Sequence, residues 1–166
     1  MTEYVWAIDP GIIRCAWAFV PTTGSYRDAD VIRTRTSMVR TVERKGARLG
    51  MLASSVRAAA IAQMDTYPPL CIWVEQPSGR FRNLTLVYAV GVVQAAAYEA
   101  TGVPVWTIPS AKWKEATVGV GNASKADVAA WVRELVEVGT QDEADAVAIA
   151  LAGRAKLLDG WDARVA

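Results

Sequence analysis

Residues 5–11 read VWAIDPG, and the interpretation of the whole chain starts from this stretch. Four apolar residues in succession predict a central strand that is buried on both faces. Asp9 ends that strand, and Pro10 and Gly11 force a turn directly after it. A buried carboxylate without a partner costs several kcal/mol or more, so a metal ion is one candidate for its partner. The alternative is that Asp9 faces solvent or accepts hydrogen bonds within its own turn.

The composition narrows the chemistry that is available to the chain. Its 166 residues are 52% hydrophobic, which predicts a single domain with a core of its own. There is no histidine, and the two cysteines, Cys15 and Cys71, lie in apolar runs that are typical of buried thiols in a reducing compartment. Histidine triads and zinc sites built from histidine or cysteine are therefore excluded. Any metal must be held by carboxylates, which favours hard ions such as magnesium or manganese.

Location and charge give further expectations. No run of about 18 apolar residues is present, so we expect no membrane span. The N-terminus, MTEYVWAIDP, lacks the basic region of a signal peptide, and a cytoplasmic location follows by default.

The net charge is only +1, yet the segment from Arg27 to Arg57 carries eight basic and three acidic residues. That segment is basic enough to touch phosphates, although a solvated helix face is the commoner explanation of such a run.

Apolar strands alternate with segments of helical periodicity, which predicts an α/β fold. We expect strands at 3–9, 14–20 and 30–36 in an antiparallel meander, a helix from Ser37 to about Asp65, a strand at 70–77, a helix at 84–101 and a strand at 103–109. The helix at 84–101 is apolar on nearly every side, so we expect it to be covered either by a second subunit or by other helices of the chain.

The last third of the chain predicts three more helices. A short helix follows from Ser110, a second is capped by Ser124 and Asp127, and a third is capped by Thr140 and Glu143. We expect residues 1–155 to form one domain and residues 156–166 a loosely held tail.

Three further acids join Asp9: one ends a second buried strand, and two lie near the start of a helix. The strand LCIWVEQP (70–77) again ends on a carboxylate, Glu75, and strands that are neighbours in a sheet lie about 4.8 Å apart, close enough for two acids to share a metal. Asp142 and Asp145 lie on one face at the start of the last helix. Asp142 could be there only to favour the helix N-terminus, whereas Asp145 leads into a close-packed run of small residues.

Such a set of acids points to phosphodiester hydrolysis, which two magnesium ions about 3.5–4 Å apart can support. Lys125, at the first position of its helix, would add a phosphate site there, and the alternative is that it is merely exposed.

The order of these motifs resembles that of RuvC-type Holliday-junction resolvases, within the RNase H-like superfamily. AIDPGIIRCAWAFV is similar to the first family motif, IWVEQP to the second, WKEATVGVGNASKADV to the lysine-bearing segment and DEADAVAIA to the last. The resemblance runs from about Tyr4 to Leu151, and the spacing of all four motifs makes it far more specific than the opening motif alone.

The resemblance implies a five-stranded mixed sheet flanked by helices, in a homodimer that makes paired nicks in a four-way DNA junction. It implies a magnesium centre, in which manganese can substitute, held by the catalytic acids Asp9, Glu75, Asp142 and Asp145, with Lys125 as a further catalytic residue. The DNA-binding candidates are Lys112, Lys114, Lys125, Arg80, Phe81 and Arg82.

The chain departs from the family where an aromatic side chain would wedge into the junction. That position is Ser78 here, and Phe81 is the candidate replacement.

The compact chain suggests a bacteriophage member. The alternative function is an RNase H-like nuclease acting on other branched DNA or on RNA. A nucleotide-binding fold of the actin and sugar-kinase type would need two lobes, for which 166 residues are too few, and retention of all four acids argues against an inactive binding module.

Overall fold

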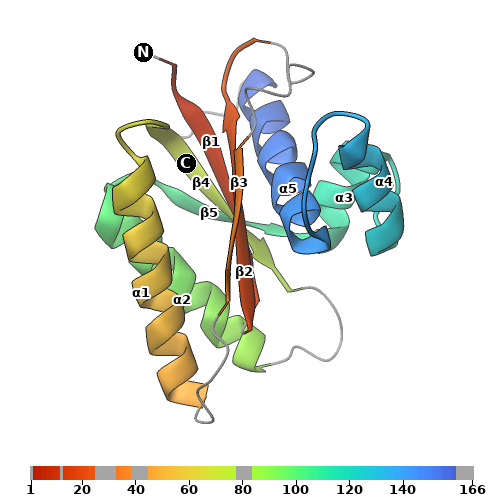
Figure 1. The fold of residues 1–166 in the computed structure, drawn as a ribbon. Helices are drawn as coiled ribbons and strands as arrows, with labels where there is room; N and C mark the ends of the chain where they lie inside the picture. The colour runs from red at the N-terminus through yellow and green to blue at the C-terminus, as the bar shows by residue number, and fades with distance from the viewer. Residues whose placement is uncertain (1, 12, 25–32, 39–44, 78–83, 160–166) are drawn as a thin grey trace.

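The computed structural model describes residues 2–11, 13–24, 33–38, 45–77 and 84–159. A central sheet separates two layers of helices, with α1 and α2 on one face and α3, α4 and α5 on the other (Figure 1). The elements are β1 (Tyr4–Pro10), β2 (Arg14–Pro21), β3 (Arg33–Met38), α1 (Lys45–Gln63), β4 (Pro69–Gln76), α2 (Leu84–Thr101), β5 (Val105–Pro109), α3 (Ser110–Val118), α4 (Lys125–Arg133) and α5 (Gln141–Leu158).

The sheet has five strands in the order β3-β2-β1-β4-β5, which confirms the expected five-stranded mixed sheet. β1, β2 and β3 pair antiparallel as a meander, while β4 and β5 run parallel to β1. Successive residues of β1 point to opposite faces, so Val5 and Ala7 belong to the core under α5, whereas Trp6 and Ile8 belong to the core under α1 and α2. β1 is therefore the central strand that the opening stretch predicts.

The boundary between the third strand and the first helix differs from the prediction. The strand continues to Met38, with Ser37 paired to Cys15 of β2, so a helix cannot begin at Ser37. Among the described residues α1 begins at Lys45, and residues 30–32 and 39–44 lie outside them. The Arg-Thr-Arg-Thr-Ser sequence has β-branched residues at alternate positions, and pairing with β2 decides its conformation.

Helix α2 has the predicted bounds, and Gly102 ends it with a φ of +71°. Of the two expected covers, the helices of the chain itself do not provide one among the described residues: α1 and the sheet cover one side of α2, but Leu84, Tyr88 and Tyr98 are 66%, 59% and 58% exposed. Cover by a second subunit stays a prediction. α2 is also long and apolar enough to cross a membrane by length and composition, whereas we expected no such segment.

Helix α5 lies across the other face of the sheet, against β1 and β2. Five of its buried residues are alanine, which lets it approach the strands closely, and its single Gly153 receives the indole of Trp73, with which any β-carbon would collide. The helix continues to Leu158 and so includes the first residues of the predicted tail, while residues 160–166 lie outside the described part.

The two predicted capping boxes have different outcomes. At α4 the box is complete, because the Ser124 hydroxyl accepts from the Asp127 amide and the Asp127 carboxylate accepts from the Ser124 amide. At α5 the Thr140 hydroxyl accepts from the Glu143 amide, but the Glu143 carboxylate accepts from the amide of Gly139 instead of that of Thr140. Both helices nevertheless begin where the sequence predicts.

Candidate functional site

Asp9 and Glu75 lie side by side at the ends of two parallel strands. The register pairs Ile8 with Val74, which brings the next residue of each strand to neighbouring positions. The two carboxyl groups are close enough for each to shift the pKa of the other. Gly11 allows the tight turn that follows Asp9. The turn brings the carbonyl oxygen of Arg14 into the space that a β-carbon at residue 11 would need.

Helix α5 brings the other two acids to the same end of the sheet. Asp145 is 4% exposed, and its Oδ1 has no hydrogen-bond partner among the described residues. Asp142, one turn earlier, is less buried and faces the pocket. The structure therefore brings together the four acids that the sequence singled out, from β1, β4 and α5.

Lys125 connects these acids from the start of α4. Its Nζ lies 3.2 Å from Asp145 Oδ2 and 3.4 Å from Asp142 Oδ1. The side chain is 56% exposed, so the ammonium also reaches solvent at the mouth of the pocket. The alternative that Lys125 is merely exposed is therefore wrong.

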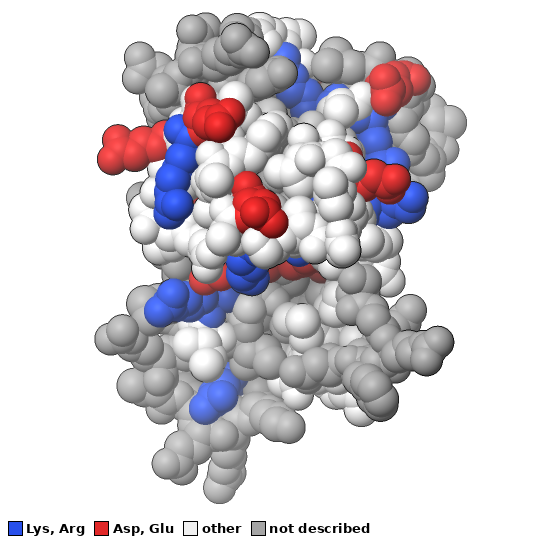
Figure 2. All heavy atoms as spheres, turned by 90° about the vertical axis from the view of Figure 1, so that its right-hand side faces the viewer, with Lys and Arg blue, Asp and Glu red and all other residues white. Residues whose placement is uncertain are grey.

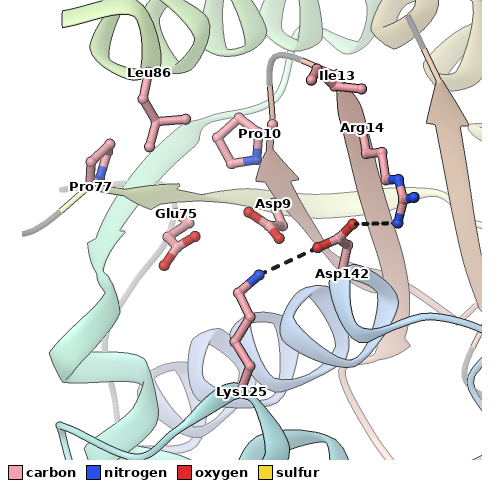
Figure 3. A pocket seen from close by; sticks show the side chains of 10 residues that line it. Asp9, Pro10, Ile13, Arg14, Glu75, Pro77, Leu86, Lys125 and Asp142 are labelled. Atoms are coloured by element: carbon pink, nitrogen blue, oxygen red, sulfur yellow. Dashed lines mark hydrogen bonds and ion pairs between the residues drawn. The ribbon is translucent and has the colours of Figure 1, made fainter. Parts of the chain in front are cut away.

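Asp9, Glu75, Asp142 and Lys125 line a pocket of about 640 Å³ with a charged end and an apolar end, and Asp145 lies behind Lys125, to which it is paired. In Figure 3 Asp9 and Glu75 point into the pocket, and Lys125 and Arg14 approach Asp142 from different sides. The apolar end is lined by Pro10, Ile13, Pro77 and Leu86. Figure 2 shows the molecule from the side of α3, α4 and α5, where acidic atoms lie in a hollow with basic side chains along its rim.

Burial raises the pKa of three of the four acids. Burial raises the pKa of Asp9 well above its usual range, and the charge of Glu75 raises it further. Burial also raises the pKa of Glu75 and that of Asp145, although the Lys125 ammonium opposes the rise at Asp145. Burial would lower the pKa of Lys125, but the charges of Asp145, Asp9 and Asp142 and the hydrogen bond to Asp145 together outweigh this effect and raise the pKa to about 12. The cluster is thus short of positive charge, and Lys125 stays protonated.

The donor set fits a hard divalent cation in its chemistry. Carboxylate oxygens are the ligands that such ions prefer, and a cation would both satisfy the partnerless Oδ1 of Asp145 and remove the repulsion between the acids. As the side chains stand, no three acids among the described residues lie close enough together to hold a metal. The Lys125 ammonium occupies the space between two of them, so metal binding requires this lysine and the carboxylates to adjust.

The remaining predicted residues have other surroundings. Lys114 Nζ donates a hydrogen bond of 2.8 Å to the carbonyl of Ala123, which holds the loop before Lys125. Lys112 pairs with Glu115 at 3.0 Å and lines a different pocket, on the side of β5. Ser78, Arg80, Phe81 and Arg82 lie outside the described residues, as do Arg27 and much of the basic segment that follows it.

Two residues at the site escaped the sequence analysis. Arg14, the first residue of β2, lines the pocket and places Nη1 3.9 Å from Asp142 Oδ2. Trp113 of α3 is buried and donates through Nε1 to Glu75 Oε1 at 3.4 Å. The signal for Arg14 was present, because an antiparallel hairpin places the start of its second strand beside the end of its first. Nothing in the sequence pattern pairs Trp113 with Glu75.

Comparison with known proteins gives a consistent family assignment. The model of the family described as crossover junction endodeoxyribonuclease RuvC matches residues 5–153. The RuvC of Nocardia farcinica is 33% identical over 158 residues, covering 89% of this chain and 78% of the relative. The RuvC of Streptomyces avermitilis is 28% identical over 160 residues, covering 89% and 84%.

Solved structures agree with the sequence comparison. Thermus thermophilus RuvC superimposes with a TM-score of 0.70 at 28% identity, covering 95% of this chain and 97% of that one. The same protein in complex with a Holliday junction substrate gives a TM-score of 0.71, covering 95% and 96%. The yeast mitochondrial Holliday junction resolvase Ydc2, at 14% identity and a TM-score of 0.58, shares the fold.

Proposed function

This chain belongs to the RuvC family of crossover junction endodeoxyribonucleases, and from that premise we infer how its pocket serves the reaction. The protein is an endonuclease that resolves Holliday junctions. The proposed mechanism rests on one observation: Asp9, Glu75 and Asp142 line one pocket that reaches solvent, and the Lys125 ammonium in that pocket also pairs with the buried Asp145.

We propose that the four acids hold magnesium, for which manganese can substitute. The metal would activate the attacking water and stabilise the leaving oxygen of the phosphodiester. Asp9 and Glu75 are placed by the strand register, and the Trp113 indole donates a hydrogen bond to Glu75. The raised pKa values favour this assignment, because a bound cation is what would allow these neighbouring carboxyls to ionise together.

Lys125 is the proposed catalytic cation of the chain itself. Its ammonium is protonated and reaches both the acids and solvent, so it can bind a non-bridging phosphate oxygen of the DNA and stabilise negative charge that develops there. Lys114 supports this role by holding the loop that ends at Ser124. Lys112, Arg80, Phe81 and Arg82 stay predicted DNA contacts.

We propose a homodimer as the acting species. The side of α2 that α1 and the sheet leave uncovered carries Leu84, Val87, Tyr88 and Tyr98, a row of large exposed apolar and aromatic side chains at helical spacing. A second copy would cover this row. A two-fold enzyme also suits a two-fold substrate, since paired nicks need two pockets related by symmetry.

We assign the nuclease unit to residues 1–155 and the protein to the cytoplasm, where it meets DNA.

A cleavage assay tests the substrate. The protein is incubated with a synthetic four-way junction, a flap, a linear duplex and an RNA–DNA hybrid of the same sequence, with magnesium or with EDTA. We expect magnesium-dependent paired nicks in the junction and little cutting of the linear duplex. Preferential cutting of the flap or the hybrid would favour the alternative RNase H-like nuclease, and no cutting of any substrate would contradict both.

A further inference from the structure

Arg14 is a basic residue that lines the pocket but has no role in the proposed hydrolysis. It begins β2, at the sheet end where β1 delivers Asp9, and its side chain is 53% exposed. It approaches Asp142 across the pocket from Lys125, so Asp142 has one cation near each carboxylate oxygen (Figure 3). Two cations from opposite walls thus flank the acids that we assign to the metal.

The contact between Arg14 and Asp142 is loose. Nη1 lies 3.9 Å from Oδ2, beyond hydrogen-bond distance, and this is the only ion pair of Arg14 within the described parts of the chain. Arg57 provides a contrast, because it donates to Glu99 through both Nε and Nη2. A guanidinium has five N–H donors, so Arg14 retains its capacity to bind another anion.

We propose that Arg14 is a DNA-binding residue that holds a backbone phosphate of the cleaved strand, next to the phosphate that is cut. The inference rests on the proposed function, because it requires Asp142 to bind the metal. A divalent ion at Asp142 attracts the carboxylate that now neutralises Arg14 and repels the guanidinium. The anion that enters the pocket with the substrate is a phosphate, and guanidinium binds phosphate through two parallel hydrogen bonds.

The position of Arg14 also limits which phosphate it can bind. The scissile phosphate must lie at the acids and Lys125, at the charged end of the pocket. Arg14 stands at the wall formed by the β1–β2 turn, beside the exposed Ile13. A strand that crosses the pocket from Lys125 therefore meets Arg14 at a neighbouring nucleotide, where the side chain fixes the strand and does not take part in bond breaking.

The test is equilibrium binding of a fluorescent four-way junction at several salt concentrations. Wild type is compared with Arg14→Gln, Arg14→Lys and a control, Arg133→Gln, which removes one charge at the far, exposed end of α4. Calcium replaces magnesium to fill the metal site, a denaturing gel checks that the junction stays intact, and circular dichroism checks that each variant is folded.

We expect Arg14→Gln to weaken binding roughly tenfold, as the loss of a charge-assisted hydrogen bond does. The slope of log affinity against log salt should fall by about 0.9, the value for one phosphate contact. Arg14→Lys should restore the slope but only part of the affinity, because lysine lacks the planar fork. Arg133→Gln should match wild type.

The inference is overturned if folded Arg14→Gln binds with the affinity and the slope of wild type, or if Arg133→Gln loses as much as Arg14→Gln. In both cases wild type still binds and cuts the junction, so the proposed function survives. If wild type neither binds nor cuts the junction, the proposed function fails first and the inference falls with it.

Discussion

At the scale of single residues, the pocket is built around a carboxylate whose surroundings disfavour its charge. Asp9 follows strand residues that pack into two cores, and its carboxyl group lies beside that of Glu75. Burial and the neighbouring acid raise its pKa, so the folded protein without metal keeps a proton that the unfolded chain releases. The residue that we propose as a metal ligand thus destabilises the metal-free protein near neutral pH.

Asp9→Asn should therefore stabilise the metal-free protein. Between the unfolded pKa near 3.8 and the raised folded value, the folded state binds more protons, so the free energy of unfolding of wild type falls as pH rises. The asparagine variant has no proton to lose at this position, so its free energy of unfolding near neutral pH should exceed that of wild type by about 1 kcal/mol or more. Each kcal/mol corresponds to a rise of roughly 2–4 °C in Tm. The advantage should shrink toward pH 4. Urea denaturation in EDTA from pH 4.5 to 8 measures it, and an advantage that grows toward acid pH would contradict the assignment.

At the scale of elements, the position of α5 decides whether Asp142 and Asp145 reach the strand ends. Buried alanines let this helix lie close to β1 and β2. Gly153 leaves the space that the Trp73 indole of β4 occupies. Close packing of this kind fixes both the distance and the rotation of the helix. The acids at its N-terminal turn depend on that contact three turns away.

Gly153→Ala should destabilise the fold by about 1–3 kcal/mol, because its methyl group enters the space of the indole and the helix must shift. Gly50→Ala is the matched control, since that glycine lies inside α1 with open space around it and alanine is the better helix former by about 1 kcal/mol. Thermal unfolding measures both. Equal stability of the two variants would contradict the packing of α5 described here.

Much of this arrangement was predictable from the sequence, for physical reasons. Strand ends in a parallel sheet meet at one edge, so Asp9 and Glu75 could be placed together without a structure. Long apolar segments such as α2 have bounds set by their own composition. The start of α1 could not be placed, because sheet pairing decides where β3 ends. Contacts between distant elements, such as Trp113 with Glu75, depend on the packed fold.

At the scale of the whole molecule, two pockets must act on one junction. The chain alone leaves the α2 row of Leu84, Val87, Tyr88 and Tyr98 exposed, and one sheet with two helical layers has no further element among the described residues to cover it. Association of two copies would hold the pockets at a fixed separation. The proposed dimer would therefore link the packing of α2 to the pairing of the nicks.

Tyr88→Glu should convert the dimer to a monomer, because a charge in the centre of an apolar interface leaves an unpaired, desolvated carboxylate. Light scattering at micromolar concentration measures the mass. Val120→Glu is the control, since it introduces the same charge at another exposed apolar residue, in the loop after α3. The monomer should lose paired nicking. A wild-type monomer, or a Tyr88→Glu variant that stays dimeric, would contradict the proposed interface.

The central claim is that the acids of β1, β4 and α5 form one metal centre, and manganese binding tests it most directly. Electron paramagnetic resonance counts free manganese as the ion is titrated into wild type, Asp145→Asn and the control Asp159→Asn, which alters an exposed acid at the end of α5. We predict that Asp145→Asn weakens binding by at least about tenfold, since even residues that only support a ligand contribute that much, and that Asp159→Asn binds as wild type does. If Asp145→Asn binds manganese with the affinity of wild type, the metal lies elsewhere and the account of the pocket is wrong.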